Sequence, residues 1–316
     1  MPGYNIEKIS VVIPVYNEEG SVAMLHKEIL DVMNALGVSY EVIFVDDGST
    51  DDTFEKLKKI SPAKVIKFRR NFGQTAALDA GIKSAKGSVI ITMDGDGQDD
   101  PAEIPKLIEK MKQGDFDVVA GWRRKRKDKF LKKFSSRSAA LIRKILVNDG
   151  IHDSGCTLKA YKKECFDHLD LVGEMHRFIP ALLKIKGFKI GETEVNHRPR
   201  MFDKTKYNWK RGVKGGLDML SVWFWKKYSS KPLHLFGGIG LLLIIISGIS
   251  IAYALYEKIV YGLDLSSTAL TDLSMFGFLI GVQFFVFGLL TDVVSKIYFA
   301  STRDTVYDIK EIIENK

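Results

Sequence analysis

The sequence predicts an α/β fold with a mostly parallel sheet covered by helices on both faces, followed by interfacial helices and two transmembrane helices. Short β-branched apolar runs alternate with helix-length amphipathic segments between residues 9 and 120. Three of these runs end in acidic motifs. After residue 231 come two long uncharged segments, each about long enough to cross a bilayer as a helix.

The individual elements follow from the spacing of the apolar residues. We expect strands at residues 9–15, 41–45, 64–68, 88–93 and 118–120, and helices at residues 21–36, 53–60, 75–85 and 101–112. Gly87 and Gly114 are expected to end the last two helices. Because ligands bind beyond the carboxyl ends of parallel strands, the motifs at residues 16–19, 46–49 and 94–98 predict a site there.

The third motif carries the clearest chemistry. Asp94 and Asp96 flank a glycine, so two carboxylates converge where a hard cation such as Mg²⁺ or Mn²⁺ could sit. A surface turn is the alternative, since aspartate and glycine are common in turns. An EF-hand is excluded because Asp99 and Pro105 stand where that loop needs glycine and glutamate.

The second motif has two interpretations. Asp46 and Asp47 could accept hydrogen bonds from a base or a ribose, and residues just beyond them could cap the next helix. No glycine-rich dinucleotide fingerprint follows a strand and no P-loop motif occurs. A nucleotide would therefore have to bind in another way.

Composition limits the class of protein. The 316 residues are 46% hydrophobic and 27% charged, which excludes wholesale disorder, a collagen and a disulfide scaffold. The net charge of +8, concentrated between Arg123 and Lys133, indicates anionic partners. Nucleic acid is not expected, because the aromatic residues cluster near the membrane segments. Cys156 and Cys165 have no metal-ligand spacing, so we expect free thiols in a reducing compartment.

The charged residues around the apolar segments predict the topology. Lys226, Lys227 and Lys231 precede the first segment, and Lys296 and Arg303 follow the second. The positive-inside rule then places the first domain and both termini in the cytoplasm. The N-terminus also lacks the pattern of a signal peptide. The protein would lie in the cell membrane, or in the endoplasmic reticulum membrane of a eukaryote.

Four regions are expected along the chain: a cytoplasmic domain that carries the acidic motifs over residues 1–208, an interfacial amphipathic region over 209–231, a transmembrane domain over 232–296 and a cytoplasmic tail over 297–316. The membrane helices should span about residues 233–256 and 273–294. Their glycines would allow close helix packing and assembly of a homo-oligomer. Asp292 is expected to pair with Lys296 at the cytoplasmic end.

Three motifs resemble family 2 glycosyltransferases, whose fold is GT-A: VIPVYNEE at residues 12–19, VDDGSTD at 45–51 and MDGD at 93–96. NFGQ at 71–74, QDDP at 98–101, HDSGC at 152–156 and HRPR at 197–200, with the two C-terminal helices, resemble the polyprenyl-phosphate glycosyltransferases. That group includes dolichyl-phosphate mannose synthases and bacterial two-helix glucosyltransferases. The chain departs from it at residues 203–207, which read DKTKY without the usual glycine, so the course of that loop stays open.

The resemblance implies residue roles. The donor nucleotide would be bound by Pro14, Tyr16, Glu18, Asp46, Asp47 and Asp94. The metal would be held by Asp94, Asp96 and Gln98, and the acceptor phosphate by Arg123, Arg137, Arg200 and Lys206. Arginine suits phosphate because its planar fork binds two oxygens. Asp153 would join Asp94 and Asp96 as a catalytic residue by orienting a sugar, or would only cap the turn at Ser154.

The implied function is inverting, metal-dependent transfer of one sugar from a nucleotide diphosphate sugar to polyprenyl phosphate, undecaprenyl or dolichyl, at the cytoplasmic membrane face. UDP-glucose or UDP-N-acetylhexosamine is favoured as donor. A GDP-mannose-using synthase and a transferase acting on a lipid-linked glycan remain alternatives, although a processive synthase would need a QxxRW motif that is absent. A membrane-tethered nucleotide-sugar-binding protein is the non-enzyme alternative.

Overall fold

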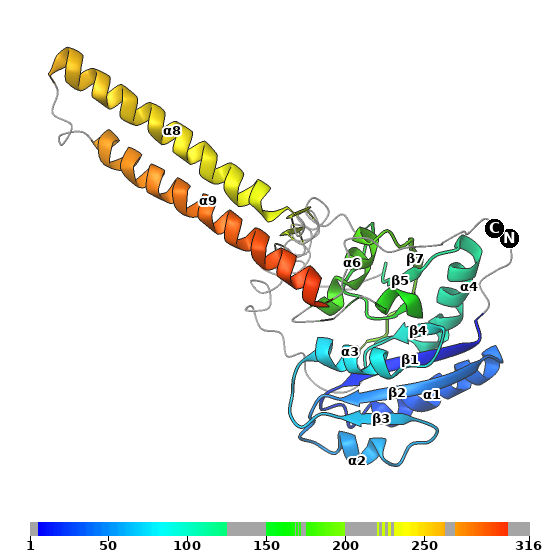
Figure 1. The fold of residues 1–316 in the computed structure, drawn as a ribbon. Helices are drawn as coiled ribbons and strands as arrows, with labels where there is room; N and C mark the ends of the chain where they lie inside the picture. Colours follow the sequence, from blue (N-terminus) through cyan, green and yellow to red (C-terminus); the bar gives the residue numbers. More distant parts are fainter. Residues whose placement is uncertain are drawn as a thin grey trace. The chain divides into compact units, whose positions relative to one another are not determined.

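The computed structural model describes residues 6–124, 150–167, 169, 171, 175–199, 220, 223–224, 227–228, 231–262 and 269–302. The chain divides into two compact units, and the second begins at Trp223. Each unit is built around its own type of secondary structure, a sheet in the first and a helical hairpin in the second (Figure 1).

The described part of the first unit forms a seven-stranded sheet in the order β3-β2-β1-β4-β6-β5-β7. β6 runs antiparallel to β4 and β5, and the other neighbouring pairs are parallel, so the predicted mostly parallel sheet is confirmed. The strands are β1 Lys8–Val15, β2 Ser39–Asp46, β3 Lys64–Lys67, β4 Val89–Thr92, β5 Val118–Trp122, β6 Lys159–Lys162 and β7 Ile190–Glu194.

Helices connect and cover these strands. They are α1 Val22–Leu36, α2 Thr53–Leu57, α3 Gln74–Ser84, η1 Pro101–Glu103, α4 Ile104–Gly114, η2 Lys163–Phe166, η3 Met175–Arg177 and α6 Ile179–Ile185. All five expected strands and all four expected helices are present, the last helix being divided into η1 and α4. β6, β7 and α6 were not expected from the sequence.

Of the two glycines predicted to end helices, one does so and the other does not. α4 ends at Gly114 as predicted, although the left-handed residue that follows is Asp115. The prediction for Gly87 was wrong, because α3 ends at Ser84. Gly87 lies against β1 instead, where an added Cβ atom would be 2.7 Å from the backbone nitrogen of Ser10. Close backbone approach, rather than helix termination, requires glycine at position 87.

Both faces of the sheet are buried under helices. Alternate residues of β1 point to opposite faces, so Val11 and Ile13 join one hydrophobic cluster and Val12 joins the other. The first cluster includes apolar residues of α1 and α4, and the second includes those of α3 and α6. This two-sided burial explains why the strands read as continuous apolar runs.

The described part of the second unit contains two long apolar helices, α8 Pro232–Tyr261 and α9 Ala269–Thr302. Both are long and apolar enough to cross a membrane. Glycines bring them together, since a Cβ atom at Gly240 would lie 2.6 Å from the carbonyl oxygen of Gly281. Glycine packing is thus used inside one chain, and homo-oligomer assembly stays a prediction. The expected pair of Asp292 and Lys296 is present at 2.6 Å.

Candidate active site

The three acidic motifs meet at the carboxyl ends of β1, β2 and β4. Asn17, which follows β1, donates its backbone N–H to Ser49 Oγ at 2.9 Å. Its side-chain oxygen accepts the backbone N–H of Thr50 at 2.8 Å. Ser21 Oγ donates to the carbonyl oxygen of Gly95 at 2.7 Å, which links the first motif to the third. The shared edge predicted from the strand order is therefore present.

Asp46, the last residue of β2, is fully buried. Its Oδ1 atom accepts the backbone N–H of Ser49 at 2.9 Å. Its Oδ2 atom is also buried and has no hydrogen-bond partner among the described residues. A buried carboxylate oxygen without a donor costs on the order of 1–3 kcal/mol, so this position suits an N–H group supplied by a ligand.

Asp47 uses its carboxylate differently. Its two oxygens accept the backbone N–H groups of Phe72 at 2.7 Å and Gly73 at 2.9 Å. Burial raises the pKa of Asp47 despite these hydrogen bonds. Gly48 has φ +70° and lies so close to Arg70 that an added Cβ atom would clash with its backbone. Asp47 therefore holds the loop before α3.

The remaining residues expected at the donor nucleotide lie on or just after β1. Pro14 is buried within the strand, and Tyr16 follows it with 39% of its surface exposed. Glu18 accepts a hydrogen bond from Ser21 Oγ at 3.1 Å and donates its backbone N–H to Thr53 Oγ1 at 2.8 Å. All three therefore share an edge with Asp46.

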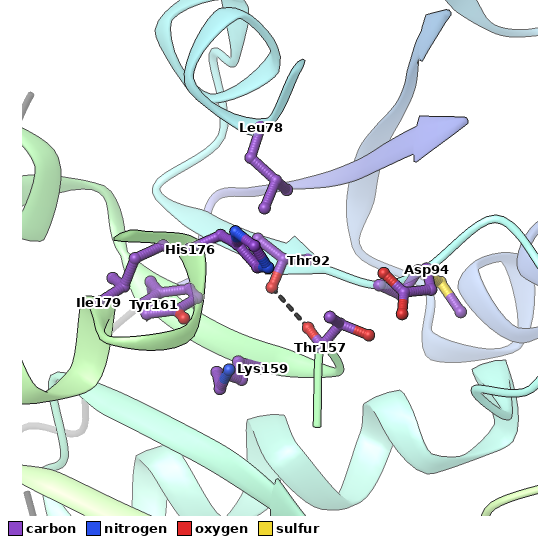
Figure 2. A pocket seen from close by; sticks show the side chains of 9 residues that line it. Leu78, Thr92, Asp94, Thr157, Lys159, Tyr161, His176 and Ile179 are labelled. Atoms are coloured by element: carbon purple, nitrogen blue, oxygen red, sulfur yellow. Dashed lines mark hydrogen bonds between the residues drawn. The ribbon is translucent and has the colours of Figure 1, made fainter. Parts of the chain in front are cut away.

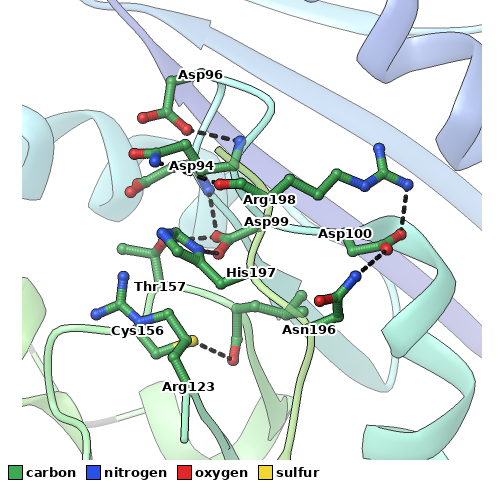
Figure 3. A network of polar contacts seen from close by, with 12 residues as sticks. Asp94, Asp96, Asp99, Asp100, Arg123, Cys156, Thr157, Asn196, His197 and Arg198 are labelled. Atoms are coloured by element: carbon green, nitrogen blue, oxygen red, sulfur yellow. Dashed lines mark hydrogen bonds and ion pairs between the residues drawn. The ribbon is translucent and has the colours of Figure 1, made fainter. Parts of the chain in front are cut away.

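Asp94 and Asp96 follow β4 (Figure 3). Asp94 Oδ1 accepts from Gln74 Nε2 at 2.7 Å, and Asp96 Oδ1 accepts the backbone N–H of Gln98 at 3.0 Å. Burial raises the pKa of Asp94 to about 7, and the negative charges of Asp99 and Asp96 add to this effect. Carboxylates gathered in this way attract a cation.

The donor atoms at this edge fit Mg²⁺ or Mn²⁺. Asp94, Asp96 and Gln98 offer hard oxygen atoms, which both ions accept. No group of three acidic, histidine or cysteine side chains in the described ranges is arranged to hold a metal. Mg²⁺ commonly binds to one or two carboxylates, while substrate phosphates and water complete its shell.

Arg123 and Asp153 form a bidentate ion pair beyond β5. Arg123 Nε and Nη2 donate to the two carboxylate oxygens at 2.7 and 3.0 Å, and both side chains are nearly buried. Burial lowers the pKa of Arg123, but the hydrogen bonds and charge of Asp153 outweigh it and raise that pKa. Asp153 also accepts the backbone N–H of Gly155 at 3.2 Å, so it caps the turn and orients Arg123 at once. Arg137, Arg200 and Lys206 lie outside the described residues.

Arg198 was not singled out from the sequence, yet it joins two motifs. Its Nη1 and Nη2 atoms donate to Glu28 and Asp100, each at 2.7 Å. Its backbone N–H donates to the carbonyl oxygen of Gln98 at 2.8 Å, and His197 forms a β-bridge with Asp99 (Figure 3). The segment leading to Arg200 is thereby fixed to the segment after Asp96.

The structure also has a small cavity beside Asp94 that the sequence did not predict. It is lined by Thr157, by Lys159 and Tyr161 of β6, and by His176 (Figure 2). His176 Nδ1 is hydrogen-bonded to Thr75 Oγ1 at 2.7 Å. Since β6 was not expected, no sequence signal placed these residues near the acidic edge.

Comparison with known proteins gives the family. Residues 10–170 match the model of glycosyl transferase family 2, and residues 231–297 match that of the GtrB C-terminal hairpin. The chain belongs to glycosyl transferase family 2. This glycosyltransferase is 34% identical to dodecaprenyl-phosphate galacturonate synthase of Rhizobium johnstonii, over 98% of the chain and 94% of that relative.

A second relative, undecaprenyl-phosphate 4-deoxy-4-formamido-L-arabinose transferase of Aeromonas hydrophila, is 32% identical to the glycosyltransferase over 100% of the chain and 97% of the relative. Among solved structures, glucosyl-3-phosphoglycerate synthase of Mycobacterium tuberculosis with Mn²⁺ and UDP-glucose matches with a TM-score of 0.56. That match has 19% identity and covers 70% of this chain and 79% of the other. It confirms the GT-A fold.

Proposed function

We propose that this glycosyltransferase moves one sugar from a UDP-sugar to a polyprenyl phosphate at the cytoplasmic membrane surface, with inversion at the anomeric carbon. One observation carries the proposal: the chain joins a carboxylate-rich GT-A edge to a hairpin of two membrane-length helices. Two full-length relatives with polyprenyl-phosphate acceptors in their names support it.

The donor base would bind at Asp46. Its buried Oδ2 atom, unpartnered among the described residues, would accept the N3–H of uracil, and the exposed ring of Tyr16 lies at the same edge. Guanine also offers a ring N–H, so a GDP-sugar is the alternative donor. Asp47 would contribute by holding the backbone of Phe72 and Gly73 beside the base.

The diphosphate would bind at Asp94 and Asp96. These residues and Gln98 would hold Mg²⁺ or Mn²⁺, which supplies positive charge to stabilise the leaving nucleotide diphosphate. The fold neighbour was crystallised with either ion. Gln74, which donates to Asp94 Oδ1, would keep the Asp94 carboxylate oriented toward the diphosphate.

The acceptor phosphate would bind at Arg123 together with Arg137, Arg200 and Lys206. Asp153 engages Nε and Nη2 of Arg123, which orients the guanidinium and leaves Nη1 for the phosphate. A lipid phosphate has a second pKa of about 6, so it is already a dianionic nucleophile near neutral pH. One of its oxygens forms a bond to the anomeric carbon while the bond from that carbon to the nucleotide diphosphate breaks.

That single displacement gives inversion and needs no strong general base. It releases UDP and leaves the sugar on the lipid phosphate. The acceptor is confined to the bilayer while the donor is dissolved in the cytosol, so the reaction requires a site at the interface. The positive-inside pattern supports a cytoplasmic position for the catalytic unit and both termini.

A donor panel tests the proposal. The full-length enzyme in lipid vesicles receives Mg²⁺ or Mn²⁺, polyprenyl phosphate and one donor from a set of UDP-glucose, UDP-N-acetylhexosamines, UDP-galacturonate and GDP-mannose. We expect UDP release that requires the lipid phosphate, with a UDP-sugar preferred. Turnover without the lipid phosphate would favour a glycan acceptor, and no turnover with any donor would favour a binding protein.

A further inference from the structure

β6 carries two buried lysines at its opposite ends. Lys159 is 2% exposed and Lys162 is 7% exposed. Lys162 has carboxylate partners, since its Nζ atom lies 2.8 Å from Asp117 and 3.7 Å from Asp115. Among the described residues, Lys159 makes no such ion pair, and its Nζ atom donates to the backbone carbonyl oxygen of Ser154 at 3.3 Å.

A buried lysine with a carbonyl as its hydrogen-bond partner needs a reason. Moving an ammonium group from water into the protein interior costs on the order of several kcal/mol. Burial lowers the pKa of Lys159, and the nearby Asp153 and Asp94 are among the groups that act in the opposite direction. Lys159 thus lines the same small cavity as Asp94 (Figure 2), and its ammonium group reaches the turn at Ser154.

The turn that contains Ser154 is anchored on both sides. Upstream, Glu192 of β7 accepts the backbone N–H of His152 at 2.6 Å and contacts its ring nitrogen Nδ1 at 2.7 Å. Trp122 stacks on the same ring with centroids 4.5 Å apart. Downstream, Lys159 holds the carbonyl group of Ser154. The residue between these anchors is Asp153.

Arg123 fits this turn closely. Asp153 binds it through both carboxylate oxygens. An added Cβ atom at Gly155 would be 3.2 Å from Arg123 Nη2, tighter than ordinary van der Waals contact. A shift of the turn would therefore move the guanidinium. The Ser154 carbonyl lies within this turn, one residue from both Asp153 and Gly155.

We infer that Lys159 is a positioning residue for capture of the acceptor phosphate. By holding the carbonyl group of Ser154, Lys159 fixes the turn through which Asp153 orients Arg123. The inference rests on the proposed function, because it requires Arg123 to receive the lipid phosphate. Lys159 itself touches neither substrate in this scheme.

Lys159→Met in the full-length chain tests this inference in vesicles. We expect the KM for polyprenyl phosphate to rise about tenfold, the size of one lost hydrogen bond in a charged network. The KM for the nucleotide sugar and the half-saturating metal concentration should change less than about twofold. Lys159→Arg, which keeps a cationic donor, should restore most of the acceptor affinity.

Lys162→Met is the matched control. It removes the other buried lysine of β6 and leaves Asp117 without that partner, so Tm should fall while both KM values stay close to wild type. Lys159→Leu, which also removes the donor, replaces the methionine variant if that variant does not fold. An acceptor KM that rises equally in Lys162→Met would reduce the effect to strand stability and overturn the inference.

A double-mutant cycle isolates the pathway. If Lys159 acts through Arg123, Lys159→Met should add no further rise in acceptor KM to an Arg123→Ala background. Additive effects, or a shift of the donor KM alone, would overturn the inference while leaving the proposed function in place. Wild-type turnover that ignores the lipid phosphate would instead overturn the proposed function, and this inference with it.

Discussion

Glu41 and Asp46 lie toward opposite ends of β2, and the described part of the protein satisfies the hydrogen-bonding capacity of the first carboxylate but not of the second. At the amino end, Glu41 accepts hydrogen bonds from Ser10 and from the backbone N–H of Lys86, and pairs with Lys8 at 3.1 Å. At the carboxyl end, Asp46 keeps one buried oxygen that no described residue satisfies. The chain itself satisfies the carboxylate at the amino end, whereas at the carboxyl end one oxygen stays available for the proposed donor base.

The pKa values follow the same division. Burial raises the pKa of Glu41, but its hydrogen bonds and Lys8 outweigh burial and lower it. At the other edge, burial and neighbouring carboxylates raise the pKa of Asp94. The chain thus gains stability at one edge of the sheet and retains unmet hydrogen-bonding capacity and negative charge at the other. Functional sites commonly carry such a local cost.

The largest effect should come from the carboxyl edge. Asp96→Asn should lower kcat/KM about 10³-fold, because charge stabilisation of the leaving diphosphate is lost. Tm without ligands should stay constant or rise, since one of several repelling carboxylates is removed. UDP release and thermal melts measure the two quantities. Retained activity would contradict the assignment of Asp96 to the metal.

Asp46→Asn should weaken the donor by about 10- to 100-fold in KM, because an amide cannot satisfy both the Ser49 N–H and the base N–H. The melting temperature should be unaffected. Asp47→Asn is the matched control, and it should lower Tm because Asp47 holds Phe72 and Gly73. If Asp46→Asn instead destabilised the protein and left the donor KM intact, the contrast within this pair would be refuted.

At the amino edge, Glu41→Gln should destabilise the protein by about 1 kcal/mol and leave turnover per folded molecule unchanged. The folded-state pKa of Glu41 is lowered, so its contribution is complete above the unfolded value of about 4.5 and is lost as pH falls through the folded pKa. Urea unfolding between pH 3 and 7 should therefore show a shallower acid loss in the variant. An equal acid loss in both proteins would contradict this origin.

The smallest effect is expected at an exposed carboxylate. Glu55 pairs with Lys58 at 2.7 Å, and both side chains are more than half exposed. Solvent screens such pairs, so Glu55→Gln should change neither Tm nor kcat/KM beyond measurement error. A clear fall in Tm would mean that a solvent-exposed ion pair does contribute to the stability of this protein, and would contradict the expected order of effects.

The sequence was sufficient to predict the strands that end in acidic motifs, because their apolar runs are continuous and their termini polar. It was insufficient for β6, which reads Lys-Ala-Tyr-Lys, since a strand with a lysine at each end does not look buried. Lys162 is buried with Asp117, 45 residues earlier, and Lys159 is buried against the backbone carbonyl of Ser154. The sequence also could not predict that the adjacent carboxylates of Asp46 and Asp47 have different hydrogen-bond partners. They depend on the loop at Phe72, which returns to Asp47 from 25 residues away.

The same limit applies to Asp153 and Arg198. Of the two interpretations of Asp153 left open by the sequence, the turn cap is present and the orientation of a sugar stays a prediction. The ion pair with Arg123 was not expected, because that residue lies 30 positions earlier in the chain. Arg198 was overlooked because nothing in its own motif indicates that Glu28, 170 residues earlier, would be its partner.

The unsatisfied oxygen of Asp46 has a consequence for the lifetime of the protein in the cell. A nucleotide that binds the folded chain stabilises it by mass action, by about 2.7 kcal/mol at a concentration 100 times its Kd. Proteases act on transiently opened chains, so occupancy by donor slows degradation. Cells that run short of the nucleotide sugar should then lose the enzyme as well as its substrate, and the amount of transferase should follow the supply of sugar.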